Sequence, residues 1–276
     1  MMKKRKICRS MAALLWMSLY LTGCSLLQND RNPEEWFKQT LGGLAGKDSF
    51  TFNGEAAVRT QSKKGFRESL SYEGTLTEHD KLTIRSMLPS QPAEVKTSKP
   101  VNIKNVHAAE SGFRRQDGQW VHLFSEGSTT LNSSLARFNP LAQLDAVSRL
   151  PKRMKEASGA ARGTKVLRIE LEPAAARQWL SEQLEAEMGM IRQQADTGGQ
   201  AGSAQEKRQL ADVWNKGDTQ LKQMLDHSEV GMVYYLTIDK KTGFPVKLSS
   251  ESVIRYLNLH NQEEEETLVN DVSFSP

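Results

Sequence analysis

Residues 234–247 read YYLTIDKKTGFPVK, and this stretch decides the fold class that the sequence predicts. Apolar and polar side chains alternate up to Asp239, which is the period of a β-strand with one face toward solvent. The next four residues are polar and end at Gly243, as in turns that reverse the chain. We therefore predict a hairpin with strands at residues 231–239 and 244–249.

The same two-residue period recurs along the chain. It predicts a second hairpin at residues 252–259 and 267–274. Upstream, it predicts strands at residues 50–53, 70–77, 82–87, 101–106, 112–115, 119–124 and 165–171. Asp117 and Gly118 form the dipeptide typical of a two-residue hairpin loop. Sequential strands joined by short turns predict an antiparallel meander.

Helical spacing of apolar residues appears in four other segments. Three of them follow Pro33, Pro140 and Pro173, and the fourth covers about residues 210–225. Residues 193–207 contain no large apolar side chain, so we predict a flexible loop there. The chain is therefore predicted to be an α+β protein, with one domain over residues 33–276 and a helical insertion at about 173–226.

The N-terminal segment has the pattern of a signal peptide. A basic stretch at residues 3–9 precedes an apolar run at residues 11–21. Eleven helical residues span about 16 Å, which is far less than the ~30 Å hydrocarbon core of a bilayer. We therefore predict that residues 1–23 are an export signal and not a membrane-spanning anchor.

The residues after this run, Leu21, Thr22, Gly23 and Cys24, resemble the lipobox of bacterial lipoproteins. The resemblance implies cleavage between Gly23 and Cys24, a diacylglyceryl thioether and palmitate on Cys24, and a lipidated tether over residues 24–32. The protein would then be anchored at the extracytoplasmic face of the cell membrane. The alternative is an ordinary secretory leader with a chance cysteine. The other cysteine, Cys8, lies in the leader, so the exported domain would have neither a disulfide nor a cysteine metal ligand.

Composition and charge exclude several classes of protein. Of 276 residues, 38% are hydrophobic and 25% are charged, which is typical of a globular domain and not of a disordered or collagen-like chain. Five of the 37 basic residues lie at positions 3–9, which leaves 32 basic residues against 33 acidic ones. The high isoelectric point therefore belongs to the leader, and we predict no nucleic-acid partner.

The order of elements resembles the LolA/LolB-like superfamily, which includes mycobacterial lipid-binding lipoproteins. The most similar segments are residues 139–144 and 239–247. The resemblance implies a curved antiparallel sheet of about 8–11 strands, an incomplete barrel, wrapped around a few α-helices. It also implies an apolar groove for acyl chains between the sheet and the helices. Soluble carriers of this superfamily lack a lipid anchor, so a fixed acceptor, sensor or assembly factor fits this chain better than a shuttle.

A set of large apolar and aromatic residues is predicted to line the groove, although each of them can equally belong to a plain core. The set is Phe50, Phe52, Tyr72, Trp120, Leu141, Leu144, Trp179, Met188, Trp214 and Tyr234.

The sequence offers little for catalysis. The five histidines, His79, His107, His122, His227 and His260, have no spacing typical of a metal site. No nucleophile elbow and no phosphate-binding loop is present. The acidic run at residues 263–266 is interpreted as a solvated hairpin turn. We therefore predict a protein that is not an enzyme, with no cofactor and no metal.

Two functions remain open from the sequence. The first is a membrane-anchored lipoprotein of the bacterial envelope that binds a lipid or another hydrophobic ligand between sheet and helices. The second is a ligand-free sensor, regulator or assembly factor that docks another envelope protein. An apolar cavity would favour the first function, and an exposed apolar patch on the helices would favour the second.

Overall fold

A computed structural model describes residues 31–60, 66–87, 109–126, 134–197, 204–258 and 260–276. The predicted leader, the lipobox with Cys24, and the predicted strand at residues 101–106 lie outside these described residues. Every core residue of the described segments lies between Trp36 and Phe274. A protein that begins at Ser25 therefore keeps all of these core residues.

Ten described strands form one sheet, within the predicted range of 8–11. They are β1 (Phe50–Thr60), β2 (Phe66–Thr77), β3 (Lys81–Met87), β4 (Glu110–Gln116), β5 (Gln119–Glu126), β6 (Lys152–Glu156), β7 (Thr164–Leu171), β8 (Glu229–Asp239), β9 (Pro245–Leu257) and β10 (Glu263–Ser275).

The sheet has the order β5-β4-β3-β2-β1-β10-β9-β8-β7-β6, and every neighbouring pair is antiparallel. In the middle of the sheet β1 pairs with β10, which joins the N-terminal strands to the C-terminal ones. The edges are β5 and β6, and within the described chain no pairing joins them. The predicted curved, incomplete barrel of the α+β class is confirmed.

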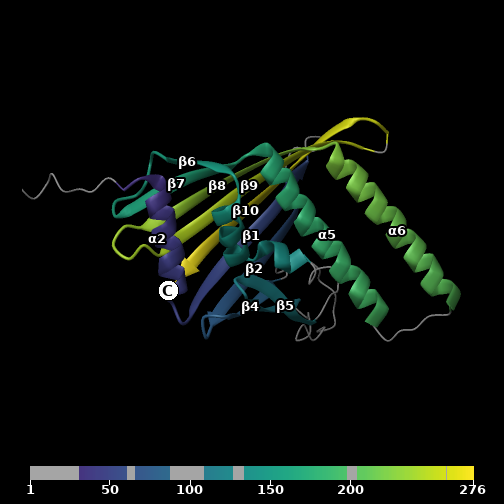
Figure 1. Cartoon of the computed structure of the whole chain (residues 1–276), viewed down its shortest axis with the longest axis horizontal. Helices are drawn as coiled ribbons and strands as arrows, with labels where there is room; N and C mark the ends of the chain where they lie inside the picture. Colours follow the sequence, from purple (N-terminus) through teal and green to yellow (C-terminus); the bar gives the residue numbers. More distant parts are fainter. Residues whose placement is uncertain (1–30, 61–65, 88–108, 127–133, 198–203, 259) are drawn as a thin grey trace, which may run out of the picture.

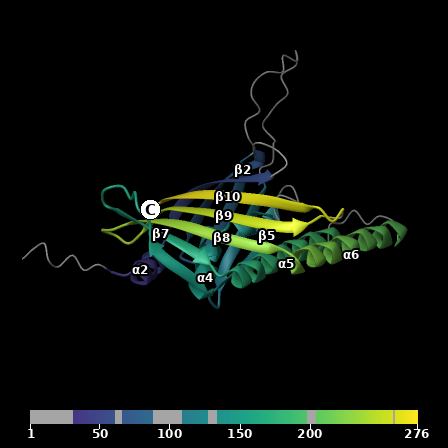
Figure 2. The ribbon, with the colours of Figure 1, turned by 90° about the horizontal axis from the view of Figure 1, so that it is seen from above.

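The helices lie on one face of the sheet, called the inner face below (Figures 1 and 2). They are α2 (Pro33–Ala45), the short 3₁₀ helix η2 (Ala136–Phe138), α4 (Pro140–Arg149), α5 (Pro173–Thr197) and α6 (Ala204–Asp226). Both views show α5 and α6 running side by side and extending past the sheet. The four predicted helical segments are therefore confirmed.

Local sequence explains where two of these helices begin. Asn32 caps α2 by accepting a hydrogen bond from the Glu35 amide, and the Glu35 side chain accepts one from the Asn32 amide. Asn139 caps α4 by accepting from the amides of Leu141 and Ala142. In both helices a proline follows the cap, where its missing N–H costs nothing.

The loop predicted at residues 193–207 is too long. Helix α5 continues to Thr197 and α6 begins at Ala204. The glutamine, alanine, glutamate and lysine residues in this stretch favour a helix but add no apolar stripe. The apolar periodicity in the sequence therefore ends before the helices end. Helix α6 also runs through Gly217 without a break, since a single glycine costs only about 1 kcal/mol.

Two further sequence interpretations were wrong. Strand β6 was missed, because its sequence KRMKE lies at the sheet edge with charged residues and shows little apolar alternation. The acidic run at residues 263–266 is not a turn: it forms the start of β10, paired with residues 254–257 of β9. Glutamates are tolerated there because Arg255, Tyr256 and Asn258 bond to them.

The β8–β9 turn has the predicted geometry. Gly243 has a φ of +74°, a left-handed conformation that favours glycine. The Asp239 carboxylate accepts hydrogen bonds from the amides of Lys241 and Thr242, at 3.0 and 2.7 Å. These bonds lower the pKa of Asp239 and fix the hairpin. The Asp117-Gly118 hairpin is also confirmed, with positive φ at both residues.

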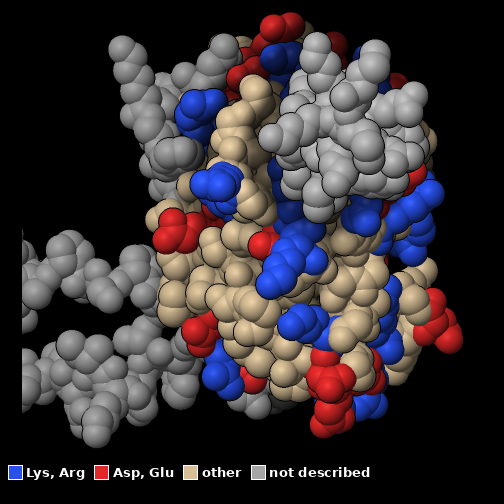
Figure 3. Space-filling view, turned by 90° about the vertical axis from the view of Figure 1, so that its left-hand side faces the viewer, with Lys and Arg blue, Asp and Glu red and all other residues tan. Residues whose placement is uncertain are grey.

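Charges of both signs are interspersed on the described surface. Figure 3 shows Lys and Arg beside Asp and Glu on the face at the left of Figure 1. Several are paired, such as Lys165 with Glu156 at 2.5 Å and Lys247 with Asp271 at 3.1 Å. This face therefore does not carry charge of a single sign.

Candidate functional site

The inner face of the sheet is built from every second residue of each strand. Antiparallel register sets these residues in rows that cross the strands. One row contains Ala56, Asn270, Ser250 and Tyr234, from β1, β10, β9 and β8. The next row contains Val58, Leu268, Ser252 and Met232. Three of these eight positions, Asn270, Ser250 and Ser252, carry short polar side chains, although they face the interior of the protein.

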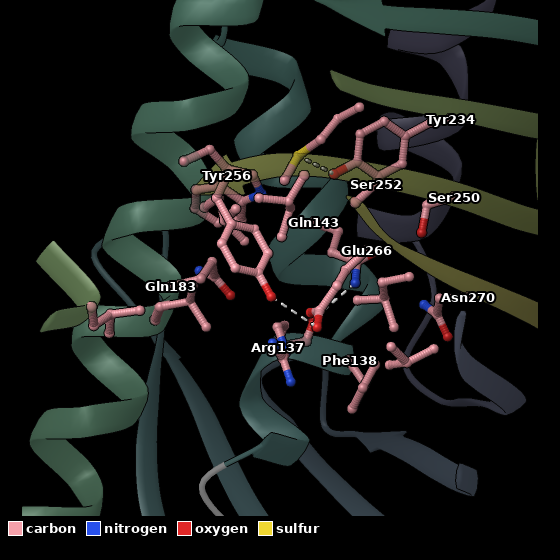
Figure 4. A pocket seen from close by; sticks show the side chains of 18 of the residues that line it. Arg137, Phe138, Gln143, Gln183, Tyr234, Ser250, Ser252, Tyr256, Glu266 and Asn270 are labelled. Carbon is pink, nitrogen blue, oxygen red and sulfur yellow. Dashed lines mark hydrogen bonds between the residues drawn. The ribbon is translucent and has the colours of Figure 1, made fainter. Parts of the chain in front are cut away.

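A cavity of about 290 Å³ lies over these two rows. Its roof comes from α5 and α6, with Trp179, Leu180, Gln183, Leu184, Leu221 and Met224. Its far walls come from η2, α4 and the strands, with Arg137, Phe138, Gln143, Ile254, Tyr256 and Glu266. Figure 4 shows Tyr256 and Gln183 on one side of this space and Asn270 on the opposite side. The volume is at the lower end of the range of about 300–1,000 Å³ for small-molecule sites.

The cavity has an inner end and a mouth. Asn270 and Tyr234 lie in the row next to Val272 and Leu248, which belong to the packed core. In the opposite direction along the strands, Leu221, Met224 and Tyr256 border both the cavity and a second hollow. That hollow is also lined by His227, Asn258 and Glu264 and lies between α6 and the β9–β10 hairpin. The cavity therefore opens beside α6.

Two buried amides at the cavity have an atom without a hydrogen-bond partner. Asn270 is 2% exposed, and its Oδ1 accepts a bond from the Tyr72 hydroxyl at 2.7 Å, but its Nδ2 has no partner. Gln143 is 9% exposed, and its Nε2 donates to the Arg137 carbonyl at 2.8 Å, but its Oε1 has no partner. Buried polar groups are nearly always paired in native proteins, so these two atoms call for an explanation.

Charged groups near the cavity are mostly engaged with one another. The Arg137 guanidinium lies 3.8 Å from a Glu187 carboxylate oxygen, and Ser134 donates to the same carboxylate at 2.7 Å. The Tyr256 hydroxyl lies 3.0 and 3.1 Å from carboxylate oxygens of Glu264 and Glu266 (Figure 4). The carboxylates of Glu187, Glu264 and Glu266 and the guanidinium of Arg137 therefore stand at or near the cavity, and this charge balance disfavours a further negative charge inside it.

The tyrosines at this site stay protonated. Burial raises the pKa of Tyr234 to about 12, and a hydrogen bond with Trp179 opposes this shift. Burial also raises the pKa of Tyr72, against the opposing effect of its hydrogen bond with Asn270. The pKa of Tyr256 is raised by burial and by the carboxylates of Glu264 and Glu266. The hydroxyl of Tyr72 can therefore donate to Asn270 at any ordinary pH.

Only two of the ten predicted groove residues lie in the cavity wall. Trp179 belongs to the roof on α5, and Tyr234 belongs to the floor on β8. The other eight predicted residues are not among those that line this cavity. They are Phe50, Phe52, Tyr72, Trp120, Leu141, Leu144, Met188 and Trp214.

These eight residues have identifiable other positions. Phe50, Phe52, Tyr72, Leu141 and Leu144 are buried in the core. Trp120 lies on β5, where the Arg115 guanidinium is 5.9 Å from its ring centre. Trp214 of α6 donates to the Met188 carbonyl of α5 at 3.3 Å, so this pair joins the two helices to each other. Large size alone did not distinguish a core residue from a wall residue.

The sequence interpretation missed the residues that make the cavity possible. Ser250, Ser252 and Asn270 occupy inner-face positions of their strands, where the alternation predicts apolar residues. The sequence did indicate where the two serines lie. Leu248, Ser250, Ser252 and Ile254 are alternate residues of β9, so they lie on the same face of the sheet. Gln143 and Arg137 carried no such signal, because they lie at the start of α4 and in η2.

Within the described residues, no three His, Cys, Asp or Glu side chains converge in a way that could hold a metal ion. In the same part of the chain, no helix has the length and apolar character needed to cross a bilayer.

No protein-family model and no curated protein sequence matches this chain. Among solved structures, it is similar to a LolA superfamily protein from Nitrosomonas europaea, with 8% identity and a TM-score of 0.27, over 88% of this chain and 93% of that one. It is also similar to a DUF1329 family protein from Desulfovibrio piger, with 8% identity and a TM-score of 0.27, over 88% and 92% of the two chains.

A third similarity is to lipovitellin, in a structure that describes the lipid–protein interactions of that protein. It has 9% identity and a TM-score of 0.37, and it covers 83% of this chain. The matched region spans 25% of the lipovitellin chain.

Proposed function

We propose that this protein is a membrane-anchored lipoprotein of the bacterial envelope that binds a lipid or another hydrophobic ligand between its sheet and its helices. The observation that carries the proposal is the cavity of about 290 Å³ beneath α5 and α6. Its roof is apolar, with Trp179, Leu184, Leu221 and Met224. Burying apolar surface against such a roof is favourable by about 25 cal/mol per Å².

The floor of the cavity supports the same proposal. Protein interiors are normally packed to high density, and large side chains could fill this space from the inner-face rows. Instead, Ser250 and Ser252 face the apolar roof on α5 and α6 from adjacent rows of β9. An apolar roof over an unfilled floor is the arrangement of a binding site rather than of a closed core.

The proposed anchor would keep this cavity close to a membrane. Helix α2 begins at Pro33. The nine residues of the proposed tether, 24–32, could extend over at most about 30 Å. Lipidated Cys24 would therefore hold the domain within reach of the bilayer surface, where hydrophobic ligands are concentrated. This geometry fits a fixed acceptor at the extracytoplasmic face of the membrane.

We also propose that the protein is not an enzyme. The described wall of the cavity contains Ser250 and Ser252 but no histidine, so neither serine has an imidazole base beside it in the wall. Binding a hydrophobic ligand requires no bond to be made or broken.

The docking function has less support. The alternative requires an exposed apolar patch on the two long helices. Among the described side chains of α5 and α6, Val213 is the only exposed large hydrophobic residue, at 67%. One exposed valine is ordinary for a protein surface.

The test of ligand binding is native mass spectrometry of residues 25–276, purified without detergent and compared before and after lipid extraction. We expect a co-purifying hydrophobic molecule at one copy per chain, which extraction removes and re-addition restores. A protein that shows only its apo mass and takes up no added lipid would support the docking function instead.

The anchor needs a separate test. Cells expressing the full chain are grown with an alkyne-tagged fatty acid, and the tag is detected on the protein. We expect labelling and membrane recovery of the wild type, and the loss of both in Cys24→Ser. The matched control is Cys8→Ser, which changes the other cysteine and should keep the label. Label retained by Cys24→Ser would contradict the proposed anchor.

A further inference from the structure

We infer that the cavity selects ligands whose polar group is uncharged and contains both a hydrogen-bond acceptor and a donor, such as an amide or a hydroxyl attached to a hydrocarbon chain. This inference rests on the proposed ligand-binding function and specifies its ligand class. It is carried by the unpartnered Nδ2 of Asn270 and the unpartnered Oε1 of Gln143, both at the cavity.

In each amide, the hydrogen bond made by one polar atom identifies the other polar atom as a donor or an acceptor. The Gln143 side chain meets the Arg137 carbonyl, which can only accept, so the nitrogen of this amide must face the carbonyl. Oε1 is thus left as an acceptor without a donor. The Tyr72 hydroxyl donates to Oδ1 of Asn270, which leaves Nδ2 as a donor without an acceptor.

A ligand that satisfies both atoms gains more than the usual hydrogen bond. A buried polar group without a partner already carries the cost of its desolvation, and a matching ligand group removes that cost. The acceptor on the ligand would meet Asn270, and the donor on the ligand would meet Gln143. A plain hydrocarbon would leave both atoms unpaired.

The surrounding charges argue against an ionised head group. The Arg137 guanidinium already faces Glu187 at 3.8 Å, and Glu266 contributes a carboxylate to the cavity wall. The one guanidinium in the described cavity wall is thus already opposed by the carboxylates of Glu187 and Glu266, so a ligand carboxylate would lose its hydration without meeting an excess of positive charge.

The position of Asn270 also orients the ligand. Asn270 lies at the inner end, two rows away from Glu266 along β10 and four residues from it in sequence. Leu221, Met224 and Tyr256 form the mouth beside α6. The polar group therefore binds at the inner end, and the hydrocarbon chain extends toward the mouth.

The test compares ligands of equal chain length on residues 25–276. Decanamide, decan-1-ol and decanoate each compete with the fluorescent probe N-phenyl-1-naphthylamine at pH 8. We expect decanamide and decan-1-ol to bind about tenfold or more tightly than decanoate, because only decanoate buries a charge. Equal or tighter binding of decanoate would overturn the inference and point to Arg137 as an anion partner.

Variants then test the two amides. In Tyr72→Phe/Asn270→Leu both partners of one hydrogen bond become apolar groups of similar shape, so the fold should be retained. Gln143→Met removes the other amide. Each variant should lower decanamide affinity about fivefold and change probe affinity by less than about twofold. Gln178→Met, at an exposed position of α5 that does not line the cavity, is the matched control and should change neither value.

The outcomes separate this inference from the function on which it rests. If the wild type binds the probe and all three ligands with no dependence on head group, the cavity binds hydrophobic ligands and the inference is wrong. Unchanged decanamide affinity in both folded variants has the same meaning. If the wild type binds neither the probe nor any decyl ligand, the proposed function itself is wrong.

Discussion

The inner face of the sheet is packed in opposite ways at its two ends. At one end, called the packed end, four phenylalanines fill the space between the sheet and α2: Phe50, Phe52, Phe244 and Phe274. Their ring centres lie 5.6–6.4 Å apart in the four contacts among them. At the other end, called the cavity end, Ser250, Ser252 and Asn270 occupy equivalent inner-face positions. The same strands β9 and β10 contribute to both ends.

The packed end is so tight that two of its strand positions must be glycine. A Cβ atom on Gly54 would lie 2.1 Å from a ring carbon of Tyr72, and one on Gly74 would lie 2.1 Å from a ring carbon of Phe52. The tips of these rings occupy the space that a side chain at each glycine would need. The difference between the two ends shows that side-chain size at alternate strand positions, and not the sheet itself, decides where this fold is filled and where it stays open.

The largest effect is expected from breaking the packed end. Phe52→Ala removes a side chain that is 0% exposed and contacts the rings of Tyr72 and Phe274. The free energy of unfolding should fall by about 3–5 kcal/mol, because a cavity forms where neighbours cannot collapse. Urea denaturation of residues 25–276 measures this value. Val213→Ala, at an exposed position on α6, is the control and should change it by less than about 0.5 kcal/mol.

High pH should destabilise the cavity end through Tyr234. Its pKa is raised by burial to about 12, from 10.0 in the unfolded chain. Below about pH 10 both states hold the proton and stability is unaffected. Between about pH 10 and 12 only the unfolded state loses the proton, so the free energy of unfolding falls by about 1.4 kcal/mol per pH unit.

Comparison with Tyr234→Phe isolates this effect from other groups that titrate at high pH. Urea denaturation at several pH values should show a shallower decline in the variant. Tyr72→Phe removes a second buried phenol with a raised pKa and should likewise show a shallower decline. Identical slopes for Tyr234→Phe and the wild type would mean that the Tyr234 phenol is not buried in solution.

Filling the cavity end should abolish binding with little effect on stability. Ser252→Phe places a ring over the floor, beside Met232 and Leu268. Affinity for N-phenyl-1-naphthylamine should fall by at least about tenfold, or about 1.4 kcal/mol. The free energy of unfolding should change by less than about 1.5 kcal/mol, because the added volume enters space that is empty. Ser273→Phe, on the outer face of β10, should leave affinity unchanged.

The smallest effect is expected at the cap of α2, which covers the packed end alone. Asn32→Ala removes the bond that the Glu35 amide donates to the Asn32 side chain, while the backbone N–H of residue 32 can still donate to the Glu35 carboxylate. Thermal and urea denaturation should show a loss of about 1 kcal/mol. Probe affinity should stay within experimental error, since no residue of α2 lines the cavity. A coupled loss of affinity would show that the two ends are not independent.

Much of the architecture could be predicted because its signals are local. The alternation in β7, β8 and β10 and the glycine turns at Gly118 and Gly243 are visible in short segments. The edge strand β6 escaped because its side chains are mainly charged and carry no alternation. The ends of α5 and α6 at residues 197 and 204 escaped because helix propensity continued after the apolar stripe had stopped.

The position of a large side chain in the candidate site could not be read from local pattern alone. Trp179 and Tyr234 line the cavity. Phe52 and Tyr72 are also large inner-face residues, yet they pack against Gly74 and Gly54 in the core. Ser250 and Asn270 are ordinary polar residues in the sequence, and only their position on the inner face shows that they line the cavity.

The sequence by itself determined that this chain is an α+β protein with an antiparallel sheet and four main helical segments. Strand period, helix period and turn chemistry are readable because they depend on neighbours within a few residues. The tertiary structure decided where the cavity lies. Cross-strand register brings Met232, Ser252 and Leu268 into one row, although they are up to 36 positions apart in the chain. Gln143 and Asn270 reach the same cavity from α4 and β10. Such contacts depend on the packing of distant elements, which no local pattern specifies.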